Sequence, residues 1–244
     1  MGHPRPFEFR TVSPPGTQDR TVTVGMQTLP TRRASPTTRR VFRERAKERW
    51  PTVLLTLVSI IQALALETLW AELAEEGELA AGGFDGIMAA LQGTAVLLSI
   101  VVVWIFFAQL VMRFVWVPGL RDTMAPFAIG LIEFVLAEFI SAGQYGLWIA
   151  LLSLAFLVAH VSLLSAFSRA AQEPENADYF ARMPEAPWRR HGPSIGAMAV
   201  MLLLAGVVEL AANELVTGIA YGLVLLVLLA QIWIQRIYWY RAIS

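Results

Sequence analysis

The chain has 244 residues, enough for one compact domain, and its nineteen basic residues balance nineteen acidic ones. Hydrophobic residues make up 56% of it and charged residues only 16%, against roughly 25% in soluble domains. The absence of cysteine excludes disulfides, thiol catalysis, iron–sulfur clusters and Cys-based zinc sites, and three scattered histidines exclude a His-rich metal site. Composition therefore predicts a membrane protein without a cofactor.

The first 50 residues are polar and basic, unlike the rest. We expect residues 1–38, rich in Pro, Thr and Arg, to form a disordered tail. Residues 39–50 read as a basic helix at the membrane interface, where cations attract anionic lipid headgroups. Nucleic acid is the alternative partner, and the lack of a pattern of interleaved aromatic residues favours lipid. The candidate lipid-binding residues are Arg39, Arg40, Arg43, Arg45, Lys47 and Arg49.

Six apolar segments follow, each long enough for a bilayer core of about 30 Å, which takes about 20 helical residues. They are approximately 51–72, 87–112, 123–142, 144–167, 194–213 and 215–238. The predicted fold is an all-α polytopic membrane protein with its membrane domain at 51–238. Its six transmembrane helices form three helical hairpins, and residues 168–193 form a cytoplasmic loop.

The distribution of basic residues supports this count. Eleven of the nineteen Lys and Arg precede Trp50, and with six spans the remaining eight fall on the same side of the membrane. The opposite side receives Glu72, Glu75, Glu76, Glu78 and Asp85. Because basic loops stay in the cytoplasm, we expect both termini to be cytoplasmic, in a bacterial inner (plasma) membrane.

Three glutamates recur at a spacing of 71 residues near the outer ends of the odd-numbered spans: Glu67, Glu138 and Glu209. This weak repeat suggests duplication of a hairpin, as in many transporters. If their faces converge, these carboxylates form an outer acidic ring that attracts cations. The alternative is that each reaches water or headgroups from a helix end.

Two further ionisable residues lie deeper. Glu133 is near mid-bilayer on the third span, and His160 lies at a similar depth on the fourth, so the two can pair if these spans are antiparallel neighbours. Such a pair can relay a proton or only fix helix packing, and the second reading is favoured. Five glutamines are expected to join helices by hydrogen bonds: Gln62, Gln92, Gln109, Gln231 and Gln235. The GxxxG of Gly218 and Gly222 permits close helix approach.

The chain has no P-loop, HExxH or GxSxG motif, so we expect no enzyme activity. Two functions remain. The first is a small cation or proton channel or transporter, with Glu67, Glu133, Glu138, His160 and Glu209 along the ion pathway. The alternative is a non-catalytic scaffold or accessory subunit of a larger membrane complex. The expected partners are the lipid bilayer, anionic headgroups and either further copies of the chain or a membrane complex, but not nucleic acid.

Overall fold

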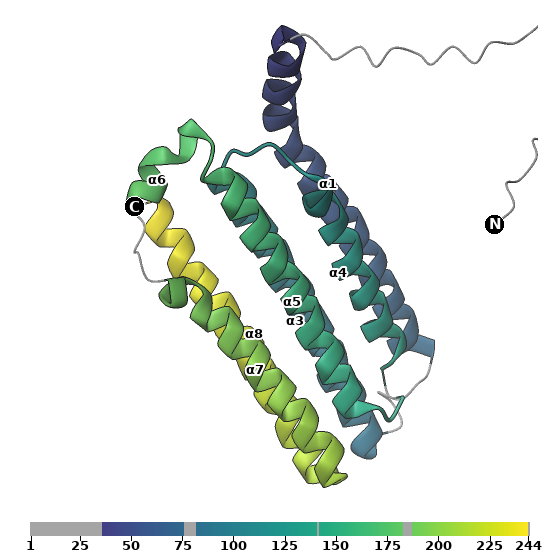
Figure 1. Ribbon diagram of the computed structural model, residues 1–244. Coiled ribbons are helices and arrows are strands. Elements are labelled where there is room, and N and C mark those ends of the chain that lie inside the picture. Colours follow the sequence, from purple (N-terminus) through teal and green to yellow (C-terminus); the bar gives the residue numbers. More distant parts are fainter. Residues whose placement is uncertain (1–35, 76–81, 141, 183–186, 244) are drawn as a thin grey trace, which may run out of the picture.

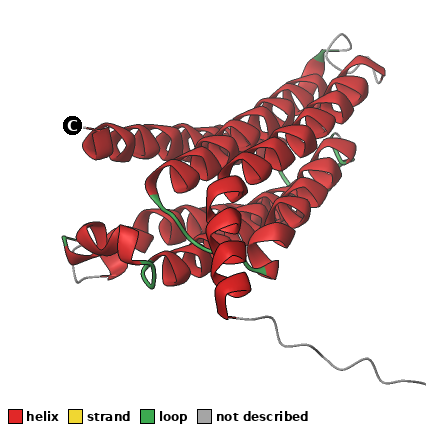
Figure 2. Ribbon diagram, turned by 90° about the horizontal axis from the view of Figure 1, so that it is seen from above, coloured by secondary structure: helices red, strands yellow, loops and turns green. Residues whose placement is uncertain are grey.

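The computed structural model describes residues 36–75, 82–140, 142–182 and 187–243, and these are helical with short connections (Figure 2). Residues 1–35 of the predicted tail lie outside the described part, and α1 already includes residues 36–38. A short 3₁₀ turn at Pro174–Asn176 precedes α6. The helices are α1 (Pro36–Glu75), α3 (Gly83–Arg113), α4 (Leu120–Glu138), α5 (Tyr145–Ala170), α6 (Ala177–Ala181), α7 (Pro187–Ala211) and α8 (Glu214–Ile243).

Five of these helices, α1, α3, α5, α7 and α8, are long and apolar enough to cross a membrane. The helix α4 is not among them, since its 19 residues include Arg121, Asp122, Glu133 and Glu138. The predicted all-helical membrane character is thus supported, whereas the sixth span is not established by this criterion.

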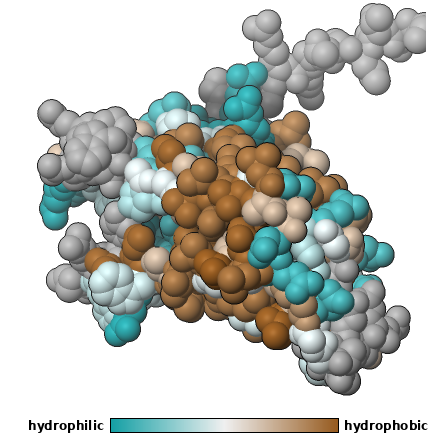
Figure 3. Space-filling model, turned by 90° about the horizontal axis from the view of Figure 1, so that it is seen from below, coloured by the Kyte–Doolittle hydropathy of each residue, from teal (hydrophilic) through white to brown (hydrophobic). Residues whose placement is uncertain are grey.

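Large apolar side chains lie exposed on the long helices, including Leu131 on α4, Leu203 on α7 and Leu226 on α8. A view from below shows a broad apolar area with hydrophilic residues around it (Figure 3). Soluble monomers rarely expose contiguous apolar surface on this scale, because it would contact water. The surface fits an integral membrane protein.

The six longest helices form two layers of three. In Figure 1, α4, α5 and α7 lie in front of α1, α3 and α8. Contacts run around a ring in the order α1, α4, α5, α7, α8 and α3, and α3 also touches α4 and α5. Helices adjacent in sequence are therefore in contact: α1 with α3, α4 with α5, and α7 with α8. The start of α1, the carboxyl end of α8 and α6 share one end of the molecule (Figure 1).

Local sequence explains where several helices begin and turn. Asn213 begins α8, because its Oδ1 accepts the backbone N–H groups of Leu215 and Val216 at 2.9 and 3.3 Å. The turn between α4 and α5 contains Gly143 at φ +72°, a conformation that favours glycine. Pro51 lies inside α1, and the first part of this helix is set at an angle to the rest (Figure 1).

Small residues let the helices approach closely. Ala65, Ala95, Ala137 and Ala170 are fully buried between helices. In lipid, helix association depends on such close packing and on hydrogen bonds rather than on the hydrophobic effect. Packing at small residues therefore fixes how each helix is rotated, and so which polar side chains face inward.

The observed boundaries differ from the expected spans at several helix ends. The helix α4 ends at Glu138, four residues before the expected end at 142, and a turn follows. We also expected residues 168–193 to form a loop, but α7 already begins at Pro187 and continues through Pro193. Proline is tolerated in the first turn of a helix, so Pro187 fits this start.

Candidate functional site

The three outer glutamates do not form a common site among the described residues. Glu67, Glu138 and Glu209 are all exposed, and they line neither of the two cavities described below. Glu209 instead binds the start of a neighbouring helix, because its Oε1 accepts the backbone N–H of Leu147 at 3.2 Å. This N–H belongs to the first turn of α5, where helical donors have no partner within the helix. The geometry at Glu209 therefore favours the helix-end interpretation over the acidic ring.

Glu133 is a buried carboxyl in the middle part of α4. It lies on α4 with 1% of its surface exposed, and neither carboxyl oxygen has a hydrogen-bond partner among the described residues. It borders a cavity of about 10 Å³ at the junction of α1, α3 and α4. That volume is near the lower limit for one water molecule.

Gln62 of α1 is the polar side chain that borders the same cavity. Its Nε2 donates to the backbone oxygen of Ile100 on α3 at 3.1 Å, and its Oε1 has no partner among the described residues. The other lining residues are apolar, including Val103 and Phe107 of α3. A carboxyl and an amide oxygen thus share a small apolar enclosure.

Gly130 explains why Gln62 comes close to Glu133. It lies one turn before Glu133 on α4, where side chains three residues apart share a face. A Cβ at Gly130 would overlap the Cγ2 of Ile61, the residue before Gln62. The absence of a side chain at Gly130 therefore lets α1 pack directly on this face of α4.

His160 is buried on α5, but it does not pair with Glu133. Its ring packs edge-on against His191 of α7, with the ring centres 5.2 Å apart. The described residues contain no hydrogen bond or ion pair between His160 and Glu133. The physical reason is helix rotation, since α5 turns His160 toward α7 whereas α4 turns Glu133 toward α1.

His160 borders a second, larger cavity of about 180 Å³. The walls come from α3, α5, α7 and α8, with Tyr179 of α6 at one side. Three glutamines line it: Gln109, Gln231 and Gln235. The cavity thus gathers three of the five glutamines that the sequence predicts to join helices.

All five glutamines join helices, as the sequence predicts. Gln62 and Gln92 connect α1 to α3 and α3 to α8, the latter through the hydroxyl of Tyr221 at 3.1 Å. Gln109 donates to the backbone oxygen of Gln235 at 3.1 Å. Gln231 and Gln235 donate to the backbone oxygens of Pro193 and Val102. In lipid such bonds hold helices together because water does not compete for them.

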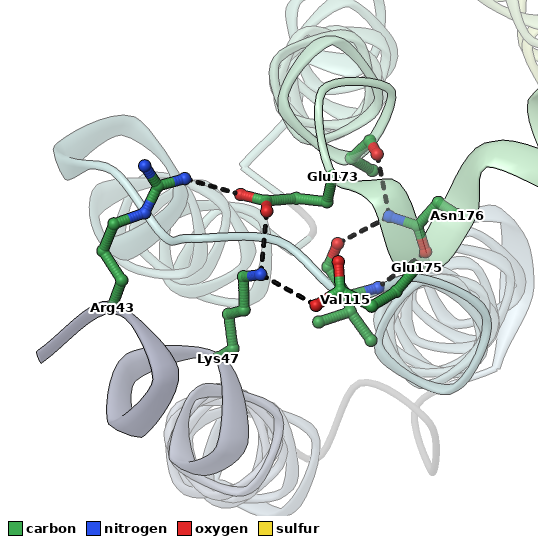
Figure 4. Close-up of polar contacts among 7 residues, drawn as sticks. Arg43, Lys47, Val115, Glu173, Glu175 and Asn176 are labelled. Carbon is green, nitrogen blue, oxygen red and sulfur yellow. Dashed lines mark hydrogen bonds and ion pairs between the residues drawn. The ribbon is translucent and has the colours of Figure 1, made fainter. Parts of the chain in front are cut away.

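The basic start of α1 is bound to the segment that follows α5 (Figure 4). Arg43 contacts Glu173 at 3.1 Å, and Lys47 lies 2.8 Å from Glu173 and 2.9 Å from Glu175. The hydrogen bond from Lys47 lowers the pKa of the Glu175 carboxyl. Two of the six candidate lipid-binding cations are therefore engaged within the chain, while Arg39, Arg40, Arg45 and Arg49 are exposed.

Two further polar side chains fix this end of the molecule. Asn176 binds both the N–H and the carbonyl of Val115, at 3.1 and 2.6 Å, and so ties the 174–176 turn to the α3–α4 connection. Asp122 is buried at the start of α4 and accepts from Trp116, from the backbone of Gly119 and from Arg169. Sequence reasoning did not single out either residue, and the only local signal was an acidic residue in the first turn of a helix.

Comparison of the chain with known protein families, with curated proteins and with solved structures finds no match.

Proposed function

We propose that the chain is an integral protein of the bacterial plasma membrane with six spans, α4 being the sixth, and with both termini in the cytoplasm. At about 1.5 Å per residue, the 19 residues of α4 extend about 28 Å, close to the thickness of the bilayer core. The outward face of α4 is apolar, with Met124, Phe127 and Leu131 exposed, while Glu133 is turned inward. With six spans all nineteen Lys and Arg fall on one side of the membrane, and this asymmetry supports the same orientation.

Within this topology we propose transport of protons, or of another small cation, with Glu133 as the ion-binding group. The single observation that carries the proposal is the buried Glu133 carboxyl without a hydrogen-bond partner among the described residues. Ionisable residues within a membrane are costly and usually mark ion pathways or proton relays. A residue that only joined helices would be expected to have a partner, as the five glutamines do.

The residues around Glu133 offer different hydrogen bonds to its neutral form and to its ionised form. A neutral carboxyl can donate its O–H to the Oε1 of Gln62 while the Nε2 of Gln62 keeps its bond to Ile100. An ionised carboxylate can only accept, so it needs the second N–H of the Gln62 Nε2 group, or a water in the cavity, as its donor. We therefore expect proton exchange at Glu133 to change which group of the Gln62 amide, its oxygen or its free N–H, binds the carboxyl.

The test is proton flux in liposomes containing the purified chain, driven by a potassium diffusion potential and read with an internal pH dye. We expect Glu133→Gln to reduce flux by about tenfold or more, because the replaced group binds the ion. Glu138→Gln, on the same helix but exposed, is the matched control and should conduct like the wild type. Equal flux through wild type and Glu133→Gln would contradict the proposal. A wild type without flux of protons, sodium or potassium would instead favour the scaffold or accessory-subunit function.

A further inference from the structure

Two of the side chains that line the cavity of about 180 Å³ between α3, α5, α7 and α8 each carry a buried polar atom without a hydrogen-bond partner among the described residues. The Nδ1 of His160 and the Oε1 of Gln235 have no hydrogen-bond partner among the described residues, and both side chains line this cavity. Buried polar atoms in proteins are nearly always hydrogen-bonded, so each exception asks for an explanation. A bound molecule that carries hydrogen-bonding groups explains these two atoms, because it gives them the partner that the described residues do not.

The hydrogen bonds of the glutamines define what the cavity offers. Gln235 uses its Nε2 to bind Val102, and Gln231 uses its Nε2 to bind Pro193. The oxygen of each amide can only accept, and the Oε1 of Gln235 is the one that is buried without a partner among the described residues. The Nδ1 of His160 also accepts when the proton is on Nε2. Hydroxyl and guanidinium groups also line the cavity, but the two buried atoms that lack a partner, Oε1 of Gln235 and Nδ1 of His160, favour a ligand that donates a hydrogen bond.

The rest of the wall determines the apolar part of the ligand. Phe106, Phe114, Phe156 and Phe167 line the cavity, and aromatic rings favour edge-on or offset packing with another ring. Among the described residues no carboxylate lines it, whereas Arg113 does, which disfavours a cationic ligand. An engineered protein cavity of about 150 Å³ is known to hold benzene. A volume of about 180 Å³ therefore suits a molecule of one ring or two small fused rings.

We propose that this cavity is a binding site for a small neutral aromatic molecule that carries one O–H or N–H donor, of the class represented by phenol and indole. The ring lies among the phenylalanines, and the donor binds Gln235 or His160. This site is separate from Glu133, and binding at equilibrium does not require ion flux, so this inference stands or falls independently of the proposed function.

The test uses the full chain in lipid nanodiscs, with calorimetric titration of phenol and of toluene and with empty nanodiscs subtracted. Toluene has nearly the same size as phenol but no donor. We expect phenol to bind about tenfold more tightly than toluene, the effect of one hydrogen bond to a buried, otherwise unsatisfied group. Equal affinities, or no binding beyond that of empty nanodiscs, would overturn the proposal.

Two variants locate the site. Ala159→Leu fills the cavity and should abolish phenol binding, whereas Val161→Leu, on the same helix but exposed and outside the cavity, should leave it unchanged. His160→Phe keeps a ring beside His191 but removes the nitrogen, and Gln235→Met removes the amide. At least one of these two should reduce the preference for phenol over toluene. Binding that Ala159→Leu leaves intact, or a preference that neither of the other variants changes, argues against this cavity.

Discussion

Lys47 holds the basic start of α1 against the turn that follows α5. Its side chain is only 9% exposed, and it contacts both Glu173 and Glu175. Ion pairs on the surface contribute little, but a cation enclosed beside a buried carboxylate is costly to remove because the carboxylate loses its partner. Glu173 is such a carboxylate, since its side chain is 7% exposed. Arg43 also contacts Glu173 and is itself mostly exposed.

Replacing Lys47 by Met should lower the stability of the detergent-solubilised chain by about 1–3 kcal/mol near pH 7, because Glu173 loses its closest cation. The loss should depend on pH through Glu175. Because Lys47 lowers the pKa of Glu175, this contact contributes fully above the ordinary glutamate pKa of about 4.3, and its contribution disappears as pH falls through the lowered value. Thermal unfolding of wild type and Lys47→Met between pH 7 and pH 3 measures the difference.

Glu175→Gln is the control for that measurement. In its background the part of the difference that comes from Glu175 should be absent at every pH. A gap between wild type and Lys47→Met that widens on acidification would show that the contact has the opposite linkage.

Single-residue roles of this kind were only partly accessible from the sequence. Arg43 and Lys47 were recognised as cations on a basic helix, but their partners lie 130 and 128 residues further along the chain. Nothing local in the sequence indicates such a pairing. Lipid attachment therefore stays a prediction for Arg39, Arg40, Arg45 and Arg49, whereas Arg43 and Lys47 have partners within the chain.

At the scale of the helices, the sequence predicts depth but not rotation. The rise of a helix predicts similar depths for Glu133 and His160. Whether two such side chains meet depends on which face each helix turns to its neighbour, and that is set by packing at residues such as Gly130. Hydropathy therefore predicted the helices, and the glutamines within the apolar segments predicted hydrogen bonds between helices. It did not predict that Gln62, rather than His160, shares a cavity with Glu133.

The glycines illustrate the same limit. The sequence motif at Gly218 and Gly222 suggested close helix approach, but a Cβ at either position would meet nothing within 4 Å in the described residues. Close approach occurs at Gly130 and at Gly146, where a Cβ would lie 2.8 Å from the backbone oxygen of Ala205. Neither of these glycines is marked by a motif, because the contact belongs to the fold and not to the local spacing.

We expect Gly130→Ala to destabilise the protein by about 1–3 kcal/mol, because the added methyl overlaps Ile61 and separates α1 from α4. Gly206→Ala is the matched control, since a Cβ there meets nothing within 4 Å and alanine is the better helix former by about 1 kcal/mol. Unfolding of both variants in mixed micelles, followed by circular dichroism, measures the effect. A Gly130→Ala protein as stable as Gly206→Ala would mean that α1 does not rely on this close contact.

At the scale of the whole molecule, the arrangement of the six longest helices determines which charged segments lie at the same end of the bundle. The described ends of α1 and α8 lie together with α6 at one end of the bundle (Figure 1). Basic residues at the start of α4 and after α5, such as Arg121 and Arg182, are exposed. The sequence could predict this common end because charge bias is readable from the chain alone. It could not establish that α4 crosses the membrane, since its four ionisable residues offset its apolar ones.

Cysteine labelling decides whether α4 crosses. The chain has no cysteine, so single-cysteine variants need no further change. Ala74, at the far end of α1, and Ala142, after α4, are exposed, as is Gln172 after α5. With six spans, a membrane-impermeant maleimide should label Ala74→Cys and Ala142→Cys in intact cells and Gln172→Cys only after permeabilisation. If α4 instead lies along the inner surface, Ala74→Cys is labelled in intact cells but Ala142→Cys is not. Because α1 and α4 pack along each other, labelling at both positions would place Glu133 within the membrane.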